Sequence, residues 1–315
     1  MAQNHEMTQA YAPRPYDFRI GIDLGGTKTE IAALAPDGSL IERRRVPTPP
    51  LYHDSVAGMA NLVLEIERTL GGRGSVGIGI PGVISPATGL VKNANTIALN
   101  GNPFDKDIQA LLEREVRVEN DANCFALSEA ADGAGAGHSI VFGVILGTGC
   151  GGGIVFDGKV MRGRHHIAGE WGHTPLPWPT PEEYPGRRCW CGRDGCLETW
   201  ISGKAFEADY VQAGGEALAA PAVVERARAG EGRARAALTR YIDRLGRGLA
   251  VVCDLADPAV IVLGGGMSNV DEIYAETPAV LARWLFSDIC VTRIAPARFG
   301  DSSGVRGAAW LWREG

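Results

Sequence analysis

The sequence predicts an α/β protein in which two similar halves face each other across a cleft. Two stretches carry the same pattern of strand, glycine-rich turn and strand, the first from residue 18 and the second from residue 139. Helical periodicity and a further strand follow each of them. A weak internal duplication of this kind is typical of two α/β domains with a ligand site between them. We expect an N-terminal domain over 18–134 and a C-terminal domain over 135–301.

The elements of the first half follow from the spacing of its apolar residues. A flexible tail is expected over 1–17. Two Ile- and Leu-containing runs on either side of the turn Pro36-Asp37-Gly38 then predict a hairpin. The remaining predicted elements are a helix over 52–70, a strand over 75–80, a helix over 104–112, a strand over 116–119 and an Ala-rich helix over 121–132.

The second half begins after a breaker of alternating Gly and Ala at 133–137. Strands are predicted over 139–146, 153–156, 159–161 and 259–263, and a mostly helical stretch over 203–255. A Pro-rich loop over 175–185 leads into a cluster of cysteines. A C-terminal helix within 302–315 is expected to pack back on the first domain.

Composition excludes several classes of protein. The net charge of −6 gives no general attraction to nucleic acid or to acidic membranes, so an anionic ligand requires a local site. No apolar run approaches the roughly 18 residues that span a bilayer, and the polar start does not resemble a signal peptide. A cytoplasmic protein is expected. The 43 Gly residues, about twice the usual share, call for a specific explanation.

Two Gly-Thr turns, one at the head of each half, are candidate phosphate-binding loops. Glycines let backbone N–H groups approach phosphate oxygens, and threonine adds a hydroxyl donor. The first loop also offers Lys28 as a positive charge and Asp23 as a carboxylate for Mg²⁺, a cation that keeps several of its waters. A tight hairpin that needs two glycines remains the alternative for this loop. The residues concerned are Asp23, Gly25, Gly26, Thr27 and Lys28 in the first loop and Gly147, Thr148 and Gly149 in the second.

Two familiar nucleotide motifs are excluded by their context. The first loop lacks the Lys-Ser/Thr pair of a P-loop, and the second is followed by strand where a dinucleotide-binding turn requires a helix. A third glycine run, Gly264-Gly265-Gly266, ends a predicted strand. It allows a flat group such as adenine to approach the backbone closely, and an ordinary strand-to-helix turn is the alternative.

The segment Glu119-Asn120-Asp121-Ala122-Asn123 lies where a strand gives way to a helix. Asn120 or Asp121 can serve as the helix N-cap. A carboxylate that faces a cleft at this point is also placed to accept a hydroxyl proton during phosphoryl transfer, with Asn120 bonding a neighbouring hydroxyl. Glu170 and Glu198 are candidate clamps for a polyol, because each carboxylate accepts bonds from adjacent hydroxyls. Exposed loop acids are the alternative interpretation.

A metal site is predicted from three clustered cysteines and one upstream histidine. The proposed ligands are His173, Cys189, Cys191 and Cys196, and Gly192 and Gly195 supply the turns between the thiols. Three thiolates and one imidazole complete a tetrahedral Zn²⁺ site with no open position, so the zinc is expected to be structural and to fix Glu170 and Glu198. Chance clustering and a redox pair are the alternatives.

In combination, these motifs resemble those of the ROK family of bacterial sugar kinases. The quoted motifs are Asp23-Leu-Gly-Gly-Thr-Lys28, Glu119-Asn-Asp-Ala-Asn123, Gly147-Thr-Gly149, Gly169-Glu-x-Gly-His173 and Cys189-x-Cys-Gly-x-x-Gly-Cys-x-Glu198. The resemblance covers about residues 18–312. Longer segments, including 79–86, 91–95, 102–107 and 300–312, look like the fructokinase branch, also called manno(fructo)kinase.

The resemblance implies an actin-like, ribonuclease-H-like fold of two domains with an interdomain cleft and a zinc-bound loop. It implies ATP, Mg²⁺ and structural Zn²⁺ as cofactors and phosphorylation of a hexose, fructose first and mannose next, at the 6-hydroxyl. Asp121 would be the general base, and Asn120, Glu170 and Glu198 the sugar contacts. His173 would be a zinc ligand that also faces the sugar. A homodimer is expected, with no nucleic-acid or membrane partner.

Other readings remain open within and beyond this resemblance. Glucose and the N-acetylated hexosamines are alternative acceptors, because hydroxyl orientation is not encoded in residue spacing. A sugar-responsive repressor of the same family is a further alternative, although no helix-turn-helix segment is expected before the first strand. Arg164-His165-His166 departs from the Gly and Asn that family members often carry there, and these bulkier residues can alter loop closure or sugar choice.

Overall fold

The computed structural model describes residues 16–313 and contains two five-stranded sheets of the same design. The first has the order β3-β2-β1-β4-β7 and the second β10-β9-β8-β11-β12. In each, the three strands at one edge are antiparallel and the others join in parallel. Because the two orders match position for position, the predicted α/β architecture of two similar halves is confirmed. The assignment of domain boundaries stays a prediction, and the predicted tail lies almost wholly outside the described residues.

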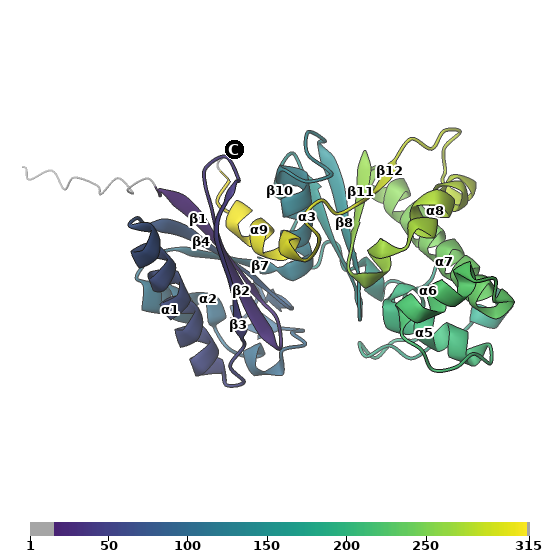
Figure 1. The fold of residues 1–315 in the computed structure, drawn as a ribbon, viewed down its shortest axis with the longest axis horizontal. Helices are drawn as coiled ribbons and strands as arrows, with labels where there is room; N and C mark the ends of the chain where they lie inside the picture. Colours follow the sequence, from purple (N-terminus) through teal and green to yellow (C-terminus); the bar gives the residue numbers. More distant parts are fainter. Residues whose placement is uncertain (1–15, 314–315) are drawn as a thin grey trace, which may run out of the picture.

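The strands of the first sheet are β1 (Phe18–Leu24), β2 (Lys28–Leu34), β3 (Leu40–Pro47), β4 (Gly74–Ile80) and β7 (Val116–Asn120). Helices α1 (Tyr52–Leu70) and α2 (Phe104–Leu112) cover its outer side (Figure 1). The apolar face of α1, with Val56, Met59, Val63 and Ile66 at helical spacing, is buried against this sheet. A small hairpin of β5 (Val83–Ile84) and β6 (Val91–Lys92) was not foreseen.

The second sheet carries a thicker helical layer, seen on the right of Figure 1. Its strands are β8 (Ile140–Leu146), β9 (Cys150–Phe156), β10 (Lys159–Val160), β11 (Val260–Gly264) and β12 (Arg293–Pro296). The helices are α4 (Glu198–Ile201), α5 (Gly203–Gln212), α6 (Ala220–Arg228), α7 (Gly232–Ala256) and α8 (Asp271–Trp284). The predicted helical stretch 203–255 is thus three helices. None of the helices in the described part of the chain is long and apolar enough to cross a bilayer.

Two helices lie between the sheets, α3 (Asp121–Ala131) and α9 (Ser303–Trp310) (Figure 1). They pack on each other at very short range: a Cβ added to Gly307 would lie 1.6 Å from the Cys124 carbonyl oxygen. Helix α9 also rests on the first sheet, where a Cβ on Gly77 would lie 1.9 Å from the Ala308 carbonyl oxygen. Such backbone-to-backbone contact is open only to glycine.

The same close packing corrects the predicted start of β9. We expected a glycine turn up to residue 152 and a strand from residue 153, whereas the strand begins at Cys150 and its glycines pair with β8. A Cβ on Gly153 would lie 2.8 Å from the carbonyl oxygen of Ala122 in α3. These glycines therefore let a helix lie against the strand, which periodicity of side chains does not reveal.

The chain crosses between the halves twice, and one carboxylate holds both crossings. Glu129 of α3 is fully buried. It accepts hydrogen bonds from the Ala134 N–H (2.9 Å) at the first crossing and from the Arg298 N–H (3.1 Å) and the Ser303 hydroxyl (2.8 Å) at the second. Glu129 therefore ties both connecting segments to α3.

Candidate active site

A cavity of about 390 Å³ opens between the two halves, and we call it the central cavity. Its wall from the first half includes Pro81, Gly82, Asn93, Asn95, Asn120, Asp121 and Ala122. Its wall from the second half includes Ile145, Gly147, Thr148, Gly149, Cys150, Gly151, Gly152, Glu170, His173, Trp190 and Glu198. The structure therefore brings together the predicted second Gly-Thr turn, the predicted base and all four predicted sugar contacts.

Asn120 and Asp121 stand at the junction of β7 and α3. Asn120 is the N-cap: its Oδ1 accepts from the N–H groups of Ala122 (2.9 Å) and Asn123 (3.2 Å), and its Nδ2 donates to the Gly82 carbonyl (3.2 Å). Asp121 begins the helix, and its Oδ1 accepts from the Ala122 N–H (2.8 Å). The capping alternative is thus realised by Asn120, which leaves the Asp121 side chain on the cavity wall.

The electrostatic setting of Asp121 suits a proton acceptor. Burial raises its pKa to about 6, the Ala122 N–H counteracts this, and the negative charge of Glu170 adds to the rise. A carboxyl with such a pKa is ionised at neutral pH yet more basic than an exposed aspartate. Asp23, at the end of β1, is also desolvated, and burial together with the charge of Asp121 raises its pKa to about 7.

The first Gly-Thr turn joins β1 to β2 as a tight hairpin. The Gly25 N–H donates to the Lys28 carbonyl (3.1 Å), and the Thr48 hydroxyl donates to the Gly25 carbonyl (2.8 Å). Gly26, Thr27 and Lys28 are exposed. This turn lies outside the wall of the central cavity, so the hairpin alternative describes its geometry while its phosphate-binding role stays a prediction.

Glu198 begins α4 and is held at both oxygens. Its Oε2 accepts from the Cys150 N–H (2.8 Å) of β9, and its Oε1 accepts from the Trp190 indole N–H (2.8 Å). Glu170 lies on the cavity wall with an exposed side chain. Partial desolvation is the main cause that raises its pKa; the charge of His173 lowers this pKa, and the charge of Glu198 raises it further. The cavity thus presents several carboxylate oxygens as acceptors for hydroxyl groups.

The predicted metal ligands converge beside the central cavity. One ligand atom from each of His173, Cys189, Cys191 and Cys196 lies within 4.8 Å of the others. The Cys189 Sγ is 3.6 Å from His173 Nδ1, and the Cys191 and Cys196 Sγ atoms are 3.5 Å apart. Zinc–ligand bonds of about 2.0–2.3 Å in a tetrahedron imply edges of roughly 3.5–3.8 Å, so the donor set fits Zn²⁺.

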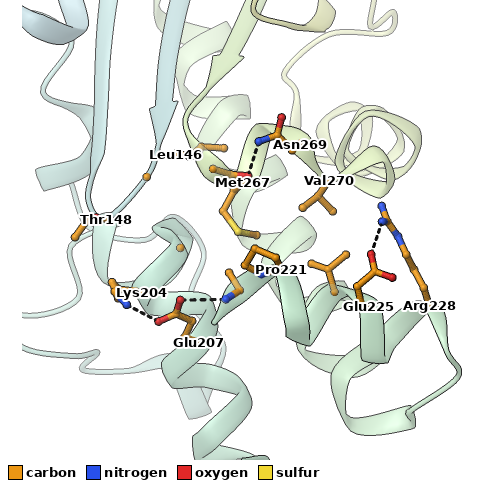
Figure 2. A pocket seen from close by; sticks show the side chains of 15 residues that line it. Leu146, Thr148, Lys204, Glu207, Pro221, Glu225, Arg228, Met267, Asn269 and Val270 are labelled. Carbon is orange, nitrogen blue, oxygen red and sulfur yellow. Dashed lines mark hydrogen bonds and ion pairs between the residues drawn. The ribbon is translucent and has the colours of Figure 1, made fainter. Parts of the chain in front are cut away.

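A second cavity, of about 540 Å³, adjoins the central one at Gly147 and Thr148, and we call it the lateral pocket. Figure 2 shows that Met267 points toward Pro221 across it. Apolar side chains of Leu146, Ala220, Pro221, Val224, Met267 and Val270 line it. Polar groups at its edge include Lys204, which contacts Glu207 (2.9 Å), and Arg228, which contacts Glu225 (3.0 Å).

The third glycine run meets this pocket through one member only. Gly266 lines the lateral pocket. Gly264 is buried, and a Cβ there would lie 2.5 Å from the Phe125 ring, whereas Gly265 has a φ of 80° and abuts the Leu146 backbone. Two of the three glycines are therefore explained by packing, and the residues on α6 and after β11 that form the pocket went unnoticed in the sequence.

The segment that departs from the common family pattern lies at the rim of the first half. His166 has a φ of 55°, and its Nδ1 is 3.3 Å from the Ile84 carbonyl of the small hairpin. Arg164 and His165 are exposed, whereas His166 is half-buried. Nearby, the Arg162 Nε donates to buried Glu119 (2.5 Å), which precedes Asn120. The loop therefore contacts the first half from the second.

The family model described as ROK family matches residues 19–315. The chain belongs to the ROK family. An N-acetyl-D-glucosamine kinase from Pectobacterium atrosepticum is 43% identical over 296 residues, which cover 92% of this chain and 97% of that protein.

Solved structures of the ROK family agree. A ROK hexokinase from Thermus thermophilus superposes with a TM-score of 0.83 at 30% identity, covering 93% of this chain and 97% of that one. A ROK glucokinase from Streptomyces griseus, in complex with glucose and AMPPNP, gives a TM-score of 0.76 at 30% identity, covering 95% of this chain and all of the other.

These findings confirm the predicted family, the actin-like fold and the class of enzyme, a sugar kinase. They do not support fructose in particular. The N-acetyl-D-glucosamine kinase, which matches over almost the whole chain, fits the alternative acceptors better than fructose.

Proposed function

We propose that this protein is an ATP-dependent kinase that phosphorylates the 6-hydroxyl of N-acetyl-D-glucosamine. The observation that carries the proposal is the position of the Asp121 carboxylate, which lines a hydroxyl-binding cavity that adjoins the lateral pocket at Gly147 and Thr148. One cavity is suited to a sugar and the other to a nucleotide base, and the shared turn lies where transferable phosphate must pass. The N-acetyl-D-glucosamine kinase relative supports the choice of acceptor.

Asp121 is the general base in this proposal. The acceptor oxygen attacks the γ-phosphorus, its proton passes to the Asp121 carboxylate, and the bond from the γ-phosphorus to the bridging oxygen breaks to release ADP. A pKa of about 6 keeps the carboxylate ionised at neutral pH. Asn120, Glu170 and Glu198 bind and orient the sugar hydroxyls, and His173 lies close enough to contact the sugar as well as a metal.

The lateral pocket takes the adenine and ribose of ATP, since its apolar side chains suit a flat ring and Gly266 leaves its wall open. The two Gly-Thr turns bind phosphate through their backbone N–H groups. Mg²⁺, when bound with ATP, neutralises developing charge on the phosphates. Asp23 is the candidate to hold Mg²⁺ through water, because a divalent cation would offset the negative charge of this buried carboxylate, whose pKa is raised by burial and by Asp121.

Structural Zn²⁺ suits the Cys3His cluster, because four protein ligands leave no position for water. Its ligands flank the sugar-facing acids in sequence, with His173 close to Glu170 and Cys196 close to Glu198. Fixing these ligands fixes the wall of the central cavity.

A coupled ADP-release assay over a panel of sugars tests the proposal. The panel consists of N-acetyl-D-glucosamine, fructose, mannose, glucose and N-acetyl-D-mannosamine. N-acetyl-D-glucosamine is expected to give the highest kcat/KM. Fructose is included because segments such as 79–86 resemble fructokinases. A higher kcat/KM for fructose would replace the proposed acceptor, and no ADP release above background with any sugar would contradict the kinase assignment itself.

A further inference from the structure

Trp190 is a large aromatic side chain left open to a cavity. It lies between two cysteines of the cluster, lines the central cavity and is 69% exposed. An exposed indole gains little from folding, and tryptophan is enriched where an apolar ring and a polar N–H both meet a partner. Neither the predicted metal site nor the predicted catalytic groups require a tryptophan at this position.

The indole N–H has a defined partner. It donates to Glu198 Oε1 at 2.8 Å, while Glu198 Oε2 accepts from the Cys150 N–H at 2.8 Å. A carboxylate gripped at both oxygens keeps one orientation, and each oxygen retains a lone pair for a hydroxyl donor. Trp190 therefore sets the direction in which Glu198 offers its remaining lone pairs.

The ring is itself fixed by its surroundings. It meets the His173 ring edge to face, with centroids 5.0 Å apart and an interplanar angle of 84°. The backbone of its turn is closed by the Gly192 N–H to the Cys189 carbonyl (3.0 Å) and the Cys189 N–H to the Arg193 carbonyl (2.8 Å). None of these backbone bonds uses the Trp190 side chain, so the ring can be changed without removing what holds the turn.

We propose that Trp190 is a positioning and specificity residue of the acceptor site. Its indole N–H orients Glu198, and its exposed face forms an apolar wall for the C–H face or the N-acetyl methyl group of the sugar. This inference rests on the proposed kinase function and deepens it, because it assigns a residue that distinguishes acceptors.

Two substitutions separate the parts of this role. Trp190→Phe keeps an aromatic ring and removes the N–H donor, whereas Trp190→Ala removes both. Loss of one hydrogen bond to a charged, partly exposed group should raise the KM for the sugar roughly 5–20-fold in Trp190→Phe, and further in Trp190→Ala. The KM for ATP and the kcat should change by less than about two-fold, because Asp121 and the lateral pocket are untouched.

Tryptophan fluorescence supplies a readout that a merely structural role would not move. The sugar should change the emission of the wild-type enzyme, and this change should be absent in Trp190→Phe. Trp178→Phe is the matched control: Trp178 is 45% exposed on the loop before the cluster and stacks on Trp284 with centroids 4.8 Å apart, away from the central cavity. It should keep both the emission change and the wild-type KM.

The zinc content of each variant is measured alongside. Sugar KM values within about two-fold of wild type in both Trp190 variants would overturn the inference. So would an equal rise in the KM for ATP, or a KM effect that appears only with loss of zinc. If the wild-type enzyme phosphorylates no sugar of the panel, the proposed function fails, and the contact between Trp190 and the sugar is then tested by titrating the tryptophan emission with the same sugars. An emission change that Trp190→Phe abolishes would support the contact. No emission change in the wild type would overturn the inference.

Discussion

The central cavity and the lateral pocket share Gly147 and Thr148 but are assembled in different ways. Every residue that lines the lateral pocket lies between Leu146 and Val270, in the second half of the chain. The central cavity draws Asn120 and Asp121 from the first half and its carboxylates and Trp190 from the second. The lateral pocket, the proposed site of the base, is thus complete within one half, whereas the central cavity, the proposed acceptor site, exists only where both halves meet.

This difference has a functional consequence. Changes in the central cavity should affect the sugar and the chemical step, because the reacting groups are divided between the halves. Changes in the lateral pocket should affect ATP alone. Because Glu129 binds both crossings between the halves, we expect a change at this residue to affect the central cavity more than the lateral pocket.

Replacing the proposed base should have the largest effect. Asp121→Asn is expected to lower kcat by roughly 10²–10⁴-fold with little change in sugar KM, since an amide keeps the bond to the Ala122 N–H but accepts no proton. Steady-state kinetics would measure this, and retained turnover would contradict the assignment. The wild-type rate should fall as the pH drops through about 6, where Asp121 becomes protonated.

The same substitution should stabilise the protein. The folded-state pKa of Asp121, near 6, lies above the ordinary value of 3.8. Ionising this carboxyl in the folded protein is therefore unfavourable, and the stability of the wild type falls progressively as the pH rises from 3.8 to about 6. At pH 7.5 the Tm of Asp121→Asn should exceed that of the wild type, and the gap should close toward pH 4. An unchanged or lower Tm at pH 7.5 would argue against a desolvated carboxylate.

Removing a cluster ligand should have the next largest effect, again on the sugar side. Cys191→Ala is expected to lose bound zinc, lower the Tm and raise the sugar KM, because Glu198 and Trp190 are held by the same loop. Metal analysis, thermal unfolding and kinetics test this together. Cys290→Ala, a half-buried free cysteine outside the cluster, is the matched control and should keep its metal. Full activity and wild-type stability of Cys191→Ala would contradict the structural role.

A change in the lateral pocket should have the smallest effect and a different signature. Met267→Ala removes part of an apolar wall and is expected to raise the KM for ATP about 3–10-fold while the sugar KM stays constant. Met59→Ala is the control, since both methionines are 2% exposed and Met59 lies in α1. It should lose comparable stability without a change in the KM for ATP. Parallel changes in both KM values would show that the two sites are not separable.

Residues with strong chemical signatures were predictable because local sequence carries them. The spacing of Cys189, Cys191 and Cys196 brought His173 into the same prediction, and the structure gathers all four. Asp121 was identified from a strand-to-helix junction, because such a junction places a carboxylate at the end of a strand whatever the rest of the fold is.

Residues without a signature were missed. Trp190 appeared only as a spacer between cysteines, because nothing in the sequence states that its indole reaches Glu198. Pro221 and Val224 of α6 meet Met267 in the lateral pocket, although more than forty positions separate them along the chain. Such pairs are set by how helices pack on the second sheet.

The glycines show the division most clearly. From the sequence, their abundance was attributed to phosphate loops, adenine and metal turns. The structure assigns several of them to the packing of α3 and α9 between the sheets, where Gly77 and Gly307 face carbonyl oxygens at distances that no Cβ tolerates. The sequence alone predicted most of the element types, the candidate metal ligands and the candidate base, because these depend on neighbours along the chain. Only the tertiary structure decided which glycines separate backbones and which side chains share a cavity, because those contacts join segments that approach each other only in the folded protein.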